Sequence, residues 1–209
     1  MATPSQAPDP QFNLGGYAQQ YSLPGVPFWP RVAARLIDTI VHLCFAFATG
    51  LIVGIAIAVV AMAKGANVQT EIARIQGGSS IPGFVLALVG AIFYQAICEG
   101  LHGSTLGKLM LGQVVLDVDR KPCGFRAGLT RSAAYLIDSL FFGAVGYFEM
   151  QKTDLHQRHG DNWANTFVCK RSEAPKEVLR GAGRFIAVLM LAGTVDMVFL
   201  AAGPLLKFF

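Results

Sequence analysis

Charged residues are scarce in this chain, and their scarcity argues against an ordinary soluble domain. Of its 209 residues, 14% are charged and 53% are hydrophobic, whereas soluble domains carry about 25% charged residues. The four cysteines have no C-x-x-C spacing, so neither a disulfide framework nor a zinc site is expected. The basic residues lie between apolar runs and form no single block, which argues against nucleic-acid binding. The composition predicts an integral membrane protein.

The N-terminus lacks the basic stretch and short apolar core of a cleaved signal peptide, so the first membrane segment is expected to be retained as an anchor. Residues 1–30 contain six prolines and a single charged residue, Asp9. Such a segment buries too little apolar surface to offset its ordering entropy. A disordered tail is therefore predicted over residues 1–27.

Three apolar runs are long enough to cross a bilayer, whose hydrocarbon core of about 30 Å needs about 20 helical residues. They comprise residues 39–63, 81–98 and 185–206. The first helix is expected to begin near Arg31, shortly after two prolines. Only Asp196 interrupts the third run.

A fourth apolar segment, residues 132–148, cannot be assigned from its length alone. If it crosses the membrane, the Lys and Arg residues divide eight against nine between the two sides; if it returns to the side it entered from, they divide fourteen against three. The positive-inside rule favours the second arrangement. We therefore expect a re-entrant or interfacial hairpin with its break near Gly143–Gly146, a cytoplasmic N-terminus and an external C-terminus.

The expected fold is an all-α integral membrane protein with three spanning helices, a re-entrant helical hairpin and a short cytoplasmic β-hairpin-like loop. That loop is predicted because Gly112–Val118 alternates weakly and a turn-like cluster follows it. Four parts are expected along the chain: the tail at 1–27, a membrane domain at 28–169, a charged linker or interfacial helix at 170–184, and an additional transmembrane helix at 185–209.

An Arg-x6-Asp element occurs twice, as Arg31 to Asp38 and as Arg131 to Asp138, and six of eight positions agree. Such residues cost about 2.5–3.5 kcal/mol each at the centre of a membrane helix. Within one helix the arginine and the aspartate lie about 10.5 Å apart along the axis, too far to pair directly. We expect the copies to enter the membrane in parallel, with Asp38 and Asp138 facing one another at similar depth. The alternative is that an arginine or a backbone donor holds each aspartate in a purely structural role.

Other motifs have ordinary explanations. The stretch from Gly103 to Lys108 departs from the Walker spacing, which predicts a membrane-exit loop with Lys108 at headgroup level. Gly50 and Gly54 form a GxxxG pair suited either to internal packing or to dimerisation. Surface histidines account for a small cluster made up of Asp154, His156, His159 and Asp161. No metal and no cofactor are expected. The sequence has no nucleophile and base at a recognisable spacing, so enzymatic activity is not expected.

Three ordered blocks resemble the RDD family, membrane proteins named for one arginine and two aspartates. Phe-Trp-Pro-Arg31-Val-Ala-Ala-Arg-Leu-Ile-Asp38 is similar to the opening signature, and residues 103–115 are similar to the loop after the second helix. Arg158-His-Gly-Asp161-Asn-Trp-Ala-Asn-Thr166-Phe-Val is similar to the closing R-x-x-D-x-x-A-x-T-x-V element. The resemblance covers residues 28–169.

The resemblance implies that Arg31 and Asp38 are the signature arginine and first aspartate. Asp161 is then the second aspartate, with Asp138 as a rival. The chain departs from the family pattern at Pro30 and Asn165, and its last helix lies outside the family core. Asp196 thus gains no support from the resemblance and stands as an additional intramembrane carboxylate.

The family has no settled general activity; the resemblance implies transport of unidentified ligands, or behaviour like that of monovalent cation/proton antiporters. Two carboxylates sharing a low-dielectric site cannot both ionise easily, which fits a proton-coupled pathway for a monovalent cation or small solute in the bacterial inner membrane. The alternative is a non-transporting scaffold or accessory subunit that binds a partner protein or anionic lipid. The expected partners are the lipid bilayer and either a second copy or another membrane protein.

Overall fold

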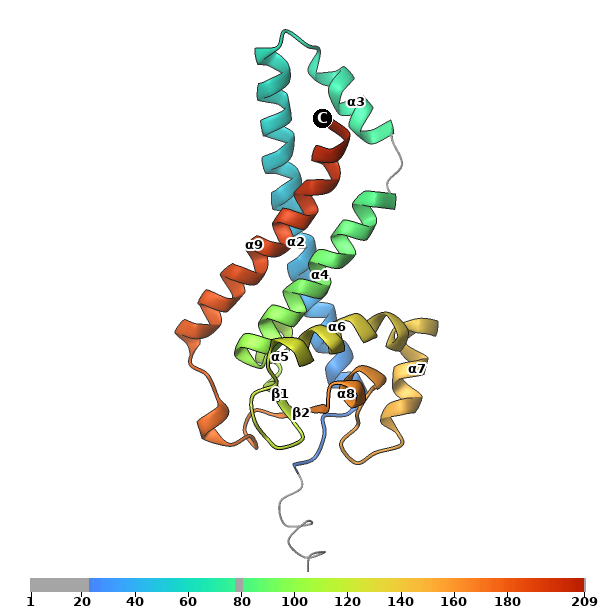
Figure 1. Cartoon of the computed structure of the whole chain (residues 1–209), viewed down its shortest axis with the longest axis vertical. Coiled ribbons are helices and arrows are strands. Elements are labelled where there is room, and N and C mark those ends of the chain that lie inside the picture. The colour runs from blue at the N-terminus through green and yellow to red at the C-terminus, as the bar shows by residue number, and fades with distance from the viewer. Residues whose placement is uncertain (1–22, 78–80, 209) are drawn as a thin grey trace, which may run out of the picture.

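Three long helices form the body of the computed structural model, which describes residues 23–77 and 81–208 (Figure 1). They are α2 (Phe28–Ala63), α4 (Ile81–His102) and α9 (Ala182–Phe208), and each is long and apolar enough to cross a bilayer. Large apolar side chains point outward from them; Phe47 and Phe84 are 76% and 69% exposed. An apolar outer surface of this kind suits contact with lipid. The three predicted spans and the all-α membrane class are confirmed.

Glycine residues allow the spanning helices to approach one another closely. A Cβ atom on Gly193 of α9 would lie 2.7 Å from the ring of Phe45 on α2, and one on Gly90 of α4 would lie 2.6 Å from Asp196 Oδ1 on α9. Neither position has room for a larger side chain. A buried cluster joins α4 to α9 and consists of Tyr94, Ile97, Cys98, Val188 and Ala192.

The fourth apolar segment folds as two helices that meet at a sharp break. Helices α6 (Phe125–Asp138) and α7 (Leu140–Met150) are separated by backbone of positive φ from Phe141 to Gly143. At 1.5 Å per residue, the 14 residues of α6 span about 21 Å, less than a bilayer core. In Figure 1, α6 lies across the bundle near the two strands, and the C-terminus lies at the opposite end. The structure thus contains the predicted break, slightly earlier than expected, while the return of this segment to the same side of the membrane stays a prediction.

A small antiparallel sheet forms one end of the molecule, which we call the sheet end (Figure 1). Strand β1 (Gln113–Asp117) pairs with β2 (Thr166–Lys170), and the short helices α5 (Leu106–Met110) and α8 (His159–Trp163) each precede one of these strands. The predicted turn after β1 closes through one isolated bridge, from Leu116 to Pro122. The main partner of β1, however, comes from about fifty residues later in the chain.

The remaining segments connect these parts. Helix α3 (Val68–Gly77) links α2 to α4 at the end opposite the sheet (Figure 1). Residues 170–184 contain only the single 3-10 turn η1 (Lys176–Val178) before α9 begins, so no interfacial helix forms there. Most of the predicted tail lies outside the described residues. Its last part is packed: Val26 is buried, and its amide donates to the Val168 carbonyl at 2.8 Å.

Candidate functional site

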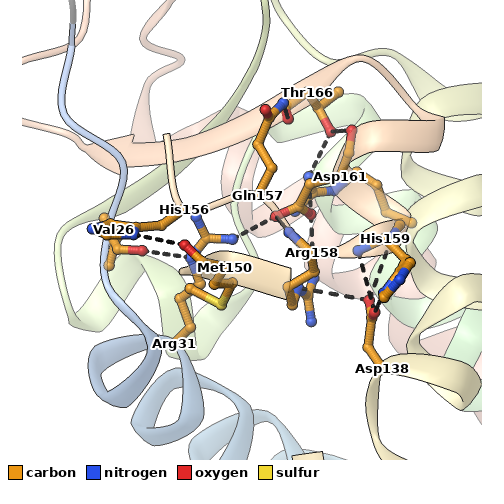
Figure 2. Close-up of polar contacts among 12 residues, drawn as sticks. Val26, Arg31, Asp138, Met150, His156, Gln157, Arg158, His159, Asp161 and Thr166 are labelled. Carbon is orange, nitrogen blue, oxygen red and sulfur yellow. Dashed lines mark hydrogen bonds and ion pairs between the residues drawn. The ribbon is translucent and has the colours of Figure 1, made fainter. Parts of the chain in front are cut away.

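Asp161, in α8, binds arginines from both copies of the repeat. Arg31 Nη1 lies 2.5 Å from its Oδ2 atom, and Arg131 Nη1 lies 2.6 Å from its Oδ1 atom. Arg158 approaches Oδ1 to 3.5 Å. The carboxylate is fully buried, and Figure 2 shows it between the side chains of Arg31 and Arg158. The two repeats therefore converge through their arginines on one shared carboxylate.

The polar contacts continue from Arg131 to the last turn of α4, the start of β2 and helix α5. Its Nε atom donates to Glu99 Oε2 at 2.8 Å, and its Nη1 atom also donates to Thr166 Oγ1 at 2.6 Å. The other oxygen of Glu99 accepts a hydrogen bond from Lys108 Nζ. This buried network joins α2, α4, α5, α6 and α8. It unites Arg31, from the opening signature block, with Asp161 and Thr166, from the closing block.

Each repeat aspartate binds the N-terminus of a short helix. Asp38 accepts hydrogen bonds from Thr105 Oγ1 at 2.6 Å and from the Gly107 amide at 2.8 Å, at the start of α5. Asp138 accepts from the Gly160 amide at 3.4 Å, at the start of α8. Free amides at a helix N-terminus favour a carboxylate. Both aspartates thus hold a short helix against a long one.

The two copies of the repeat also match in the structure that follows their eight residues. The glycines that face the aspartates, Gly107 and Gly160, each lie six residues before the start of a strand. A Cβ atom on Gly107 would lie 2.0 Å from the Ala34 carbonyl, and one on Gly160 would lie 2.9 Å from the Ala134 side chain. Ala34 and Ala134 occupy equivalent repeat positions. The chain therefore contains an internal duplication in which helix, short helix and strand recur in the same order.

This arrangement differs from the expected one. Asp38 and Asp138 were predicted to face one another from parallel copies, but each has its own donors, and α6 lies across the bundle instead of running beside α2 (Figure 1). The backbone donors at two helix N-termini explain the difference. The guanidinium of Arg35, three residues before Asp38, stacks 4.0 Å from the Tyr135 ring centroid.

The closing signature element also positions His159 and Arg158 around Asp138. The His159 Nδ1 atom lies 3.1 Å from Asp138 Oδ1, and Arg158 Nε lies 4.0 Å from Oδ2 (Figure 2). His159 Nε2 is 3.4 Å from Glu149. Among the described residues, no group of three metal-binding side chains is present.

Electrostatics keep the network charged. Burial alone would raise the pKa of Asp161, but the guanidinium groups of Arg131, Arg158 and Arg31 outweigh it and hold that pKa well below its usual range. Burial would likewise lower the pKa of Arg131, yet the neighbouring carboxylates of Asp161 and Glu99 raise it. Burial lowers the pKa of Lys108 despite its pairing with Glu99.

A second polar pair lies between the spanning helices. His42 Nδ1 on α2 is 2.7 Å from Asp196 Oδ2 on α9, and the Asp196 side chain is fully buried. Among the described residues, its Oδ1 atom has no hydrogen-bond partner. Twelve residues after Arg184, Asp196 lies about 18 Å along the helix, near the middle of a 30 Å core. The sequence singled out Asp196, whereas His42 was missed because an uncharged histidine does not interrupt an apolar run.

Glu99 and Lys108 were also missed as site residues. Glu99 marked only the end of the second apolar run, and Lys108 was expected at headgroup level, but it is buried. The available signal was that both are charged and lie only nine residues apart, on either side of the connection between α4 and α5. The GxxxG pair does not take part in internal packing, since a Cβ atom on Gly50 or Gly54 would meet nothing within 4 Å.

Three spanning helices and a buried arginine–carboxylate network at one end define an integral membrane protein of α-helical class. A family model described as RDD family matches residues 26–165. The chain belongs to the RDD family, which confirms the resemblance drawn from its three sequence blocks. No curated protein and no solved structure matches it.

Proposed function

We propose that this protein forms a proton-coupled pathway for a monovalent cation or small solute across the bacterial cytoplasmic membrane, without catalysing a covalent reaction. The observation that carries the proposal is the His42–Asp196 pair buried between α2 and α9. Ionisable residues within spans are costly, and they mark ion and proton pathways in membrane proteins. Imidazole is the side chain whose charge changes near neutral pH, so it suits proton transfer.

Small cavities with polar side chains in their walls support access to this pair from the sheet end. One, of about 60 Å³, is lined by Asp38, Thr39 and His42 together with Arg35. A neighbouring cavity of about 20 Å³ shares Arg35 and Asp38 and reaches Lys108. A water molecule needs roughly 10–15 Å³ of such space and a few polar partners. Hydrated in this way, the two cavities would lead protons from the charge network to His42.

The proposed orientation follows the charge distribution. The sheet end, including the α6–α7 hairpin, carries fourteen Lys and Arg residues, and the opposite end carries three. Positive residues are retained on the cytoplasmic side. The sheet end and the N-terminus are therefore proposed to be cytoplasmic, and the C-terminus external.

Reconstituted vesicles test this function. Cation-driven proton movement, followed with a pH-sensitive dye inside the vesicles, should fall at least about tenfold in His42→Gln and Asp196→Asn, because loss of a proton-transferring group typically costs more than that. His156→Gln, outside the spans, is the matched control and should transport like the wild type. Asp38→Asn and Asp138→Asn test the repeat in the same assay. Wild-type flux in both the His42 and the Asp196 variants would remove the pair from the mechanism.

The second candidate is a membrane scaffold or accessory subunit. It is favoured by the buried network itself, in which Arg31, Arg131 and Glu99 join five elements and leave each carboxylate occupied. Purification in mild detergent followed by mass determination separates the candidates. A stable homo-oligomer would support an enclosed pathway, and constant stoichiometry with another membrane protein would support the accessory role.

A further inference from the structure

A cavity of about 430 Å³ lies between α2 and the α6–α7 hairpin. This volume is within the range of pockets that bind small molecules. Three arginines line it, Arg31, Arg35 and Arg158, together with one carboxylate, that of Asp138. Apolar side chains make up much of the remaining wall: Phe28, Val32, Leu36, Phe142 and Met150. The cavity is thus cationic on one side and apolar on the other.

The cationic side is not neutralised by the protein. The charge network and its neighbours contain one more basic than acidic side chain: Arg31, Arg35, Lys108, Arg131 and Arg158 against Asp38, Glu99, Asp138 and Asp161. Within the described part of the chain, Arg35 has no carboxylate at ion-pair distance, and its guanidinium only stacks on Tyr135. Arg35 is half-buried, and charges withdrawn from water are normally paired. An anion is the partner that this excess requires.

Unused hydrogen-bond donors point to the same ligand chemistry. Arg31, whose side chain is only 6% exposed, has a buried Nη2 atom that finds no hydrogen-bond partner among residues 23–77 and 81–208. Arg158 Nε is also buried and without one, because Asp138 is 4.0 Å away. Buried donors are rarely left unpaired. These donors therefore suit a ligand with several acceptor oxygens.

The apolar side of the cavity adjoins the lipid-facing surface. Phe142, at the break of the hairpin, is fully exposed, and Leu36, on α2, is 61% exposed. Trp29, on the first turn of α2, is 73% exposed, and tryptophan is enriched at the membrane–water interface. The cavity thus lies at headgroup depth and opens toward the acyl chains.

We propose that this cavity binds the headgroup of an anionic phospholipid. The arginines would donate to the phosphate oxygens, and the acyl chains would leave past Leu36 and Phe142 into the bilayer. Arginine suits this task because its planar guanidinium binds phosphate through paired donors. The bound lipid would balance the excess positive charge between α2 and α6. The proposal is independent of proton-coupled transport and applies equally to a scaffold.

Native mass spectrometry of the full-length protein tests the site. Phosphatidylglycerol should bind at least about tenfold more tightly than phosphatidylcholine with the same acyl chains. Arg35→Gln should weaken phosphatidylglycerol binding about tenfold, because it removes one charge-assisted contact. Arg126→Gln, an exposed arginine on α6, is the matched control and should bind like the wild type. Equal binding of the two lipids to the wild type, or an equal loss in both variants, would overturn the proposal.

Inorganic phosphate separates the lipid from a free anion. In tenfold excess over phosphatidylglycerol it should leave the bound lipid in place, since it makes no apolar contacts. Full displacement would overturn the lipid assignment and identify a site for soluble anions. The two-lipid comparison on the wild-type protein requires no substitution, so it decides the proposal even where Arg35→Gln fails to fold.

Discussion

Replacing Asp161 with asparagine should destabilise the protein severely. The carboxylate lies 2.5 Å from Arg31 and 2.6 Å from Arg131 and is fully buried, so the substitution leaves buried guanidinium groups without their counter-charge. Breaking one buried ion pair costs about 3–5 kcal/mol. At about 2–4 °C per kcal/mol for a chain of this length, the melting temperature should fall by on the order of 10 °C.

Thiol reactivity provides the assay, because Cys98, Cys123 and Cys169 are buried in the folded protein. A thiol-reactive fluorophore followed during heating in detergent reports their exposure. Asp119→Asn is the matched control: Asp119 is 71% exposed, and its pairing with Lys121 at 3.9 Å contributes little. A melting temperature for Asp161→Asn within about 2 °C of the wild type would refute the reasoning.

The difference in stability between the wild type and Asp161→Asn should depend on pH, because the pKa of Asp161 is lowered in the folded protein. A carboxyl whose folded pKa is depressed contributes stability above its unfolded pKa, about 3.9, and loses that contribution as the pH falls toward the folded value. The wild type should therefore keep its advantage over Asp161→Asn unchanged between pH 6 and 8, and the advantage should shrink below about pH 4. An advantage that shrinks between pH 8 and 6 would contradict the assigned pairing.

Three further outcomes are expected. Gly107→Ala should lower the stability by about 1–3 kcal/mol in the same melting assay, because its Cβ would meet a carbonyl of α2. Gly50→Ala, with open space around it, is the control and should not lower the stability. Equal effects of the two substitutions would argue against the close approach at Gly107. Burial raises the pKa of Cys123 to about 11. At pH 8, iodoacetamide should therefore label Cys123 far more slowly in the folded protein than after unfolding, as measured by peptide mass spectrometry. Rapid labelling before unfolding would contradict its burial. Single-cysteine probes at Lys152 and Asn67 should label from opposite sides of the membrane, and labelling from the same side would mean that the α6–α7 segment crosses it.

Much of the architecture could be predicted because it depends on local composition. A 25-residue uncharged run must be a helix in a bilayer, since every backbone group has to be satisfied internally. The charge count favoured a hairpin over a fourth span, and the glycines at positions 143 and 146 predicted a break close to the one in the structure. The family signature marked Arg31 and Asp161 as important residues, because each signature block is a short local pattern of residue types.

The partners of those residues could not be predicted in the same way. Arg31 and Asp161 are 130 residues apart, and which carboxylate meets which arginine depends on how α8 packs against α6 and α2. Asp38 was expected to face Asp138, but both bind helix N-termini that are visible only after the short helices form. His42 became notable only because α9 places Asp196 beside it.

The sequence by itself determined that this is a membrane protein of the RDD family, because apolar length and motif order are properties of the chain read in one dimension. Only the tertiary structure decided how the charges are balanced. Buried ion pairs form between segments far apart in the chain, and their energies depend on distances of a few ångströms that no spacing of residues specifies. The duplicated Arg-x6-Asp element thus predicted two arginines and two aspartates that each need a partner. The fold places both arginines on one carboxylate and each aspartate at the N-terminus of a short helix.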